Sequence, residues 1–300
     1  MIEYDAHDWR SHLLDIRGSM VREIFGRVTT CVVWSALVVA ADRFTQDIYG
    51  FSLAIDAIAH TLIGAALSLL LVFRTNASYD RFWEGRRQWG SIVNECRNLA
   101  RATSAHLARD PATVSRILHW TMVFPWACMN HLRGTPGLGQ PVASLPAAAS
   151  LPDEQTAAVA ASGHRPLAVS RRISAELAAE ESISDFTRMT IDQNVQRLVD
   201  CIGACERIHN TPLPFAYVVH LRRALIMFCF TLPFALLGPF KWGTVLATLL
   251  IAYVLYGIEE IGVEIADPFG HDDNDLPLEQ ICRRIETDVR EIHDATIPPG

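Results

Sequence analysis

The stretch AIAHTLIGAALSLLLVFRTNASYDRFWEGRRQWG, residues 57–90, predicts one long helix that leaves a membrane partway along its length. Its first part, 57–73, contains no Asp, Glu, Lys or Arg, and about 17 apolar residues is the lower limit for crossing a bilayer. Its second part is densely polar, yet no proline separates the two parts. We therefore expect the helix to continue from the membrane into water.

The polar part of this stretch is predicted to meet partners at the membrane–water boundary. The charged residues expected to face such partners are Arg74, Arg81, Glu84 and Arg86. Aromatic side chains interleave with them, and such large apolar groups favour burial against other helices. These aromatic residues are Tyr79, Phe82, Trp83 and Trp89.

Three further stretches lack Asp, Glu, Lys and Arg: 28–41, 224–240 and 242–258. The last two are separated only by a short turn at 239–243 and predict a helical hairpin that is apolar on every face. The alternative is four buried core helices of a soluble protein. A composition of 50% hydrophobic and only 20% charged residues favours the membrane.

The distribution of basic residues predicts the orientation in the membrane. The loop at 42–56 and the turn at 239–243 hold one basic residue each, and the other 24 of the 26 lie in the remaining segments. Basic residues accumulate on the cytoplasmic side. We therefore expect a multi-pass membrane protein with both termini in the cytoplasm.

This reasoning predicts an all-α integral membrane protein with five segments. They are a cytoplasmic N-terminal segment 1–27, a first transmembrane hairpin 28–73, a cytoplasmic helical domain 74–220 with an irregular loop at about 134–170, a second transmembrane hairpin 221–260, and a cytoplasmic C-terminal segment 261–300.

The cytoplasmic domain is predicted to be helical, because apolar residues recur at helical spacing and no alternating strand pattern occurs. The expected helices are Glu84–His106, Thr113–His131, Asp185–His209 and a short one near Asp153–Ala161. Two prolines, Pro212 and Pro214, are expected to end the preceding helix before the third apolar span begins.

Catalytic motifs are absent from the sequence. It holds no phosphate-binding glycine loop, no HExxH zinc motif and no GxSxG elbow, so we expect no enzyme. The histidines, among them His60, His119 and His131, are scattered, and His60 is interpreted as a packed intramembrane residue. The seven cysteines, including Cys201 and Cys205, are interpreted as packing residues. A net charge of −7 argues against a nucleic-acid partner.

A dense acidic run follows the fourth apolar span. It begins at Glu259-Glu260 and continues through Asp267–Asp275. Neighbouring carboxylates repel one another unless a cation or arginines neutralise them. The run is therefore either a neutralised site or a solvated turn.

Four segments of the chain resemble the bestrophin family in its bacterial branch. They are FRTNASYDRFWEGRRQWG at 73–90, CERIHNTPLPFAYVVHLRRAL at 205–225, LPFAL at 232–236 and EEIGVEIADPFGHDDNDLPLEQIC at 259–282. The resemblance spans nearly the whole chain except the region around 134–170.

The resemblance implies a homopentameric ion channel with four transmembrane helices per subunit around a central pore. In that family the second membrane helix lines a hydrophobic neck, and the matching residues here are Ala65, Leu69 and Phe73. Ala65 is smaller than the family's usual neck residue. A second constriction at the cytoplasmic exit corresponds to Phe186.

The resemblance also implies the partners of the protein. The side chains of Asp272 and Asp275 match the family's calcium clasp, and no other cofactor is expected. The expected partners are further copies of the chain, membrane lipid and permeant monovalent ions, whose sign stays open. A secondary transporter and a membrane-anchored scaffold without conduction are the alternative functions.

Overall fold

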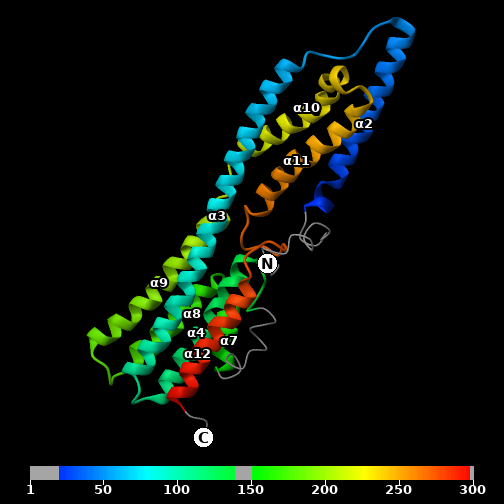
Figure 1. The fold of residues 1–300 in the computed structure, drawn as a ribbon. Coiled ribbons are helices and arrows are strands. Elements are labelled where there is room, and N and C mark those ends of the chain that lie inside the picture. The colour runs from blue at the N-terminus through cyan, green and yellow to red at the C-terminus, as the bar shows by residue number, and fades with distance from the viewer. Residues whose placement is uncertain (1–19, 139–150, 298–300) are drawn as a thin grey trace. The chain divides into compact units, whose positions relative to one another are not determined.

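All regular elements in the described part of the chain are helices (Figure 1). The computed structural model describes residues 20–138 and 151–297, and no strand occurs within them, as predicted for an all-α protein. The chain divides into two compact units. One comprises the residues up to Phe82 with Pro212–Asp267 and Asp272–Asp275, and the other comprises Trp83–Thr211, Pro268–His271 and the residues from Leu276 onward.

The first unit is a set of long apolar helices. They are α2 (Val21–Tyr49), the N-terminal part of α3 (Ala57–His106), α10 (Phe215–Phe240), the short 3-10 helix η1 (Lys241–Gly243) and α11 (Thr244–Glu264). Helix α2 packs against both α10 and α11, which also contact each other. The core that they share contains Cys31, Leu67, Leu71, Leu225, Phe228 and Ala252.

Helix α3 is continuous through the change from apolar to polar sequence, which confirms the predicted continuation. The expected burial of its aromatic residues holds for Trp89, which is fully buried. It is wrong for Tyr79 and Trp83 within one chain, because their side chains are 54% and 57% exposed. Residues four apart share one side of a helix, and the chain itself leaves this side uncovered.

Among the described residues, three continuous helical stretches are long and apolar enough to cross a membrane: α2, α3 and Phe215–Glu264. The third contains α10, η1 and α11. The chain turns between the two longer helices at Lys241, whose φ is +48°. The two apolar runs that predicted a hairpin, 224–240 and 242–258, thus belong to two helices, α10 and α11. These helices lie side by side (Figure 1).

A buried carboxylate organises the link between α2 and α3. Helix α2 continues past the predicted span to Tyr49 and is capped by Gly50, whose φ of +62° suits a residue without a Cβ. The carboxylate of Asp42, only 5% exposed, accepts hydrogen bonds from Gln46 Nε2, Ser52 Oγ and the Leu53 N–H, each at 2.8 Å. These bonds satisfy a charge that would otherwise be costly to bury.

The second unit is also helical. Besides the C-terminal part of α3 it contains α4 (Pro111–Leu132), α7 (Asp153–Ala160), α8 (Arg165–Ala179), α9 (Asp185–Asn210) and α12 (Leu278–Thr296). Helices α4, α7 and α9 confirm three predicted helices. Helix α8 begins at Arg165, so the loop expected to reach about residue 170 ends earlier; residues 139–150 of that loop lie outside the described residues.

Side-chain caps fix where three helices of the second unit begin. The Asp110 carboxylate accepts from the N–H groups of Ala112 and Thr113 at the start of α4. Ser184 Oγ accepts from the Thr187 N–H at the start of α9. Before α8 the cap is a histidine, since His164 Nδ1 accepts from the Leu167 N–H at 3.2 Å. Such caps satisfy N–H groups that have no partner within the helix.

The interpretations of His60 and of the cysteines as packing residues are confirmed. His60 is 8% exposed, and its Nε2 lies 3.1 Å from Thr231 Oγ1 and 3.2 Å from the Phe228 carbonyl oxygen. All seven cysteines are free and buried.

Candidate functional site

The structure brings the three predicted neck residues together on one exposed side of α3. Ala65 is exposed, and the side chains of Leu69 and Phe73 are 54% and 56% exposed. On the opposite side of the helix, Leu67 and Leu71 are buried in the core at 2% and 1%. A spacing of four residues repeats the same side at each turn, so the first three form an uncovered apolar stripe.

The same side of α3 changes from apolar to polar directly after the stripe. Asn76 and Asp80 continue the line of Phe73 at helical spacing, and both are exposed. The helix therefore presents an apolar surface followed by a polar one without turning away.

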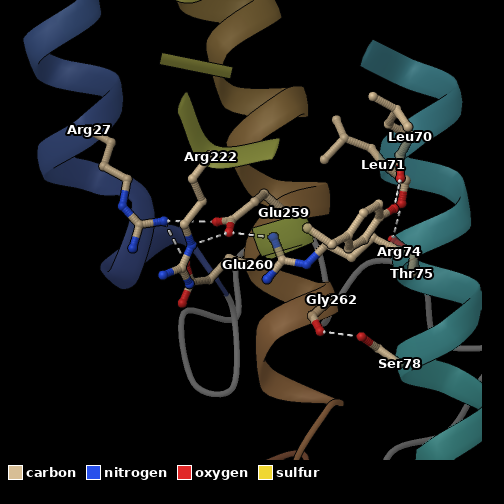
Figure 2. Close-up of polar contacts among 11 residues, drawn as sticks. Arg27, Leu70, Leu71, Arg74, Thr75, Ser78, Arg222, Glu259, Glu260 and Gly262 are labelled. Carbon is tan, nitrogen blue, oxygen red and sulfur yellow. Dashed lines mark hydrogen bonds and ion pairs between the residues drawn. The ribbon is translucent and has the colours of Figure 1, made fainter. Parts of the chain in front are cut away.

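A buried ion pair fastens α3 behind this stripe. Arg74 Nη1 lies 2.6 Å from Glu259 Oε1 at the end of α11, and the two side chains are 3% and 2% exposed. Figure 2 shows that two further arginines reach the same carboxylate. Arg222 Nε in α10 donates to Oε1 at 3.0 Å, and Arg27 Nη1 in α2 donates to Oε2 at 3.2 Å and to Glu260 at 2.6 Å.

One carboxylate thus joins all four long helices of the first unit. Desolvating a charge is expensive unless opposite charges and hydrogen bonds compensate it, and Glu259 receives this compensation from three guanidinium groups. The sequence had indicated partners for Arg74 and neutralisation for the acidic run, but not that they were each other's partners. The available signal was a charged residue directly after each of two apolar spans, Arg74 after 57–73 and Glu259 after 242–258.

Hydrogen bonds to backbone carbonyls extend this attachment of α3. Ser78 Oγ donates to the Gly262 carbonyl oxygen at 2.7 Å (Figure 2). One turn further, Arg81 Nε donates to the Ala266 carbonyl oxygen at 2.9 Å. From α10, the Tyr217 hydroxyl donates to the Leu70 carbonyl oxygen at 3.0 Å. The exposed stripe therefore belongs to a helix that is attached to the rest of the first unit by an ion pair and several hydrogen bonds.

The acidic turn after α11 holds an unusual carboxylate. Asp275 is 3% exposed, and its Oδ2 accepts from the Asp272 N–H at 2.7 Å. Its Oδ1 is buried and has no hydrogen-bond partner among the described residues. Burial raises the pKa of Asp275 to about 6, and the charges of Asp272, Asp267 and Glu264 raise the pKa as well.

The two predicted calcium ligands are close in the chain but differ in surroundings. The Asp272 side chain is exposed, whereas that of Asp275 is buried. A buried oxygen without a donor, among carboxylates, suits a hard cation that takes oxygen ligands. The residues present therefore fit Ca²⁺.

Phe186 lies in the other unit, in the first turn of α9, and its side chain is 82% exposed. Met189, three residues later, is 66% exposed. An uncovered phenylalanine in water is unfavourable unless another molecule or subunit surrounds it.

Comparison with known proteins identifies relatives along almost the entire chain. A family model described as "Bacterial/Fungal Bestrophin protein" matches residues 1–291. The voltage-dependent anion channel-forming protein of Synechocystis sp. is 37% identical and aligns over 97% of this chain and 93% of its own length. A protein of the same description from Escherichia coli K12 is 30% identical over 99% and 96% of the two chains.

A solved structure shares the fold. The bacterial bestrophin homologue from Klebsiella pneumoniae superimposes with a TM-score of 0.82 at 30% sequence identity, covering 90% of this chain and 98% of that one.

Proposed function

The chain belongs to the bacterial and fungal bestrophin family, and from this membership we propose that five copies form a channel for small monovalent anions. Each subunit contributes four transmembrane helices, α2, α3, α10 and α11, and α3 lines a central pore. The cytoplasmic part is built from the helices of the second unit. The protein acts in conduction and carries out no catalysis.

The observation that carries this proposal is the exposed stripe of Ala65, Leu69 and Phe73. In a pentamer each residue becomes a ring of five apolar side chains. A narrow apolar ring offers an ion no replacement for its hydration shell, so such a neck gates by losing water. Asn76 and Asp80, exposed on the same side, supply a polar continuation of the pore.

The low burial of α3 within its own chain supports the same arrangement. In its most apolar part 22% of the residues are buried, against 33% for α2 and 39% for Phe215–Glu264. Helix α3 thus leaves the largest share of its surface to a pore, to neighbouring subunits and to lipid.

The names of the relatives favour anions as the permeant ions. Those from Synechocystis and E. coli are both described as voltage-dependent anion channel-forming proteins. The apolar neck does not determine the sign of the ion, because it selects through dehydration.

Phe186 is proposed to form the second constriction, at the cytoplasmic exit. Its exposure of 82% in one chain is what a pore-facing aromatic residue requires, since five such side chains would cover one another around the axis.

Calcium is proposed to bind at Asp272 and Asp275, with backbone carbonyl groups completing the 6–8 oxygen ligands that Ca²⁺ takes. The buried Oδ1 of Asp275, which has no hydrogen-bond partner within 20–138 and 151–297, supports this. A bound cation would also relieve the repulsion among the neighbouring carboxylates.

The expected location is the bacterial inner membrane with both termini cytoplasmic, because 24 of the 26 basic residues lie on one side of the spans. A reporter fused at Gly300 that is active only outside the cytoplasm should stay silent, and strong activity would contradict this orientation.

Purified protein in planar bilayers tests the proposal. Unitary currents with a reversal potential that follows the chloride gradient would support an anion channel, and native mass spectrometry should give five subunits. A reversal potential that follows the cation gradient would refute the ion sign. Saturable counterflow without currents would indicate a transporter, and neither activity would indicate a scaffold.

A further inference from the structure

Two histidines and a glutamate from three helices meet in the second unit. His131 lies in the last turn of α4, His164 caps α8, and Glu206 lies in α9. His131 Nε2 is 2.8 Å and His164 Nε2 is 3.0 Å from the same oxygen, Glu206 Oε1. The two imidazole rings stack with centroids 4.7 Å apart.

These three groups form a convergent set of metal-ligand atoms. One ligand atom from each residue lies within 4.8 Å of the other two. The side chains are 22%, 38% and 26% exposed, so an ion can reach them from solvent. Two imidazole nitrogens with one carboxylate oxygen are donors that suit Zn²⁺ and its transition-metal neighbours, whereas Ca²⁺ and Mg²⁺ prefer oxygen alone.

We propose that His131, His164 and Glu206 bind one divalent transition-metal ion of the zinc class, with water in the fourth position. Zinc lies about 2.0–2.2 Å from imidazole and carboxylate ligands, and its tetrahedral geometry therefore separates neighbouring ligand atoms by roughly 3.3 Å. The present contacts of 2.8 and 3.0 Å need to open by only a few tenths of an ångström.

Metal binding is expected to move the proton of each imidazole ring from one nitrogen to the other. An ionised carboxylate only accepts hydrogen bonds, so without metal each Nε2 carries the hydrogen directed at Glu206. Metal takes the place of that hydrogen, and the neutral ring then carries its proton on Nδ1. In His164 this nitrogen accepts from the Leu167 N–H at 3.2 Å. Metal binding therefore displaces the cap of α8.

The site would tie together the end of α4, the start of α8 and the C-terminal part of α9. This function is independent of conduction, because the three ligands lie within one unit and include none of the proposed pore residues. The sequence did not reveal it, since the ligands are separated by 33 and 42 positions, match no metal-binding motif and were scattered among eleven histidines.

The decisive variant is His164→Asn. Asparagine is a favoured N-cap residue, so it keeps an acceptor for the start of α8 while removing the imidazole. Glu206→Gln keeps the shape of the third ligand but removes its charge. His106→Gln is the matched control, because His106 is exposed at the end of α3 in the same unit and lies outside the triad.

Full-length protein in detergent, stripped with a chelator, should be titrated with ZnCl₂ by calorimetry, with CaCl₂ as the comparison ion. We expect one tight zinc equivalent per chain, no competition by calcium, and an affinity lowered at least about tenfold in His164→Asn and in Glu206→Gln. His106→Gln and Asp275→Asn should bind zinc like the wild type. Zinc-edge absorption should show imidazole nitrogen in the wild type.

Equal zinc affinity in the wild type and in both triad variants would overturn the proposal, as would the absence of a tight equivalent in the wild type. In either case the triad is a hydrogen-bond network only. Unchanged helical circular dichroism and elution volume of the variants exclude unfolding as the cause of lost binding. Channel currents are not needed for the result, so failure here is separable from failure of the proposed channel function.

Discussion

Arg74 and Glu259 form a buried ion pair whose two members differ in their other partners. The Arg74 guanidinium lies 2.6 Å from the Glu259 carboxylate, with both side chains almost fully buried. Glu259 also contacts Arg222 and Arg27. Arg74 Nε, in contrast, is buried without a hydrogen-bond partner among the described residues. Without Arg74, the Glu259 carboxylate therefore keeps two arginine partners. Without Glu259, the buried Arg74 guanidinium loses its ion-pair partner.

Glu259→Gln should destabilise the protein more than Arg74→Gln does. Removing the carboxylate leaves the charge of Arg74 buried without compensation, which costs about 3–5 kcal/mol. Removing Arg74 leaves Glu259 with two arginines, so we expect about 1–3 kcal/mol. Thermal unfolding of both variants in detergent measures the order. The reverse order would show that Arg74 has compensation from another group.

Leu69→Ala combined with Phe73→Ala should raise basal current and keep near-native thermal stability, because wider rings stay hydrated. The matched control is Leu67→Ala with Leu71→Ala on the buried side of the same helix, which should lose about 2–5 kcal/mol per substitution without extra current. Bilayer recording and melting on one preparation check both. Destabilisation of the first variant without added current would assign the stripe to packing.

Phe186→Ala should change conductance or ion selectivity with little effect on unfolding, since exposed substitutions usually stay within about 0.5 kcal/mol. Met189→Ala, also exposed on α9, is the control and should leave both conduction properties unchanged. Single-channel recording measures the two variants. An equal effect of both substitutions would assign the constriction to the helix surface in general rather than to Phe186.

Asp275→Asn should stabilise the protein in the absence of calcium and should lose this advantage over the wild type when calcium is added. The pKa of Asp275 in the folded protein, about 6, lies above the unfolded value of about 3.9. The folded state thus holds the extra proton, and stability falls as pH rises from about 4 to 6.

At pH 7.5 in chelator, the ionised Asp275 carboxylate is buried with one hydrogen bond, from the Asp272 N–H to Oδ2, and with no partner for Oδ1 among the described residues. Asp275→Asn should therefore be more stable than wild type by about 1–3 kcal/mol. Calcium should stabilise the wild type and not the variant. Asp273→Asn, an exposed neighbour, should behave as wild type. Equal calcium stabilisation of wild type and Asp275→Asn would place the ion elsewhere.

His119 should make the second unit sensitive to acid. Burial, followed by the charges of His293 and Arg290, lowers the pKa of His119 to about 4, and Ser115 is its hydrogen-bonding neighbour. The unfolded state binds the extra proton below about pH 6.5, so stability falls as pH decreases from 6.5 to 4.

His119→Gln should remove about 1–3 kcal/mol of this acid-dependent loss, a range that allows for partial solvent screening. Circular dichroism melting between pH 7.5 and 4.5 measures the difference from wild type. His106→Gln, with an exposed imidazole, should keep the wild-type slope. Identical slopes for His119→Gln and wild type would show that His119 titrates normally.

The sequence by itself determined the features that depend on neighbouring residues. Apolar length located the long helices, the lack of proline from residue 57 to residue 90 predicted one continuous α3, and Pro212 and Pro214 predicted the break before α10. These follow from local backbone chemistry and helical period. Long ordered motifs also indicated the family, which the comparisons confirm.

Only the tertiary structure decided which distant groups meet and which side of a helix stays uncovered. Helical spacing alone could not tell whether Leu69 faces a core or an open surface, because a packed side and an exposed side have the same period. Nor could it pair Arg74 with Glu259, 185 positions later, or bring His164 to His131 and Glu206. Such contacts depend on how helices pack, and the energy of a buried charge depends on partners that the local sequence does not contain.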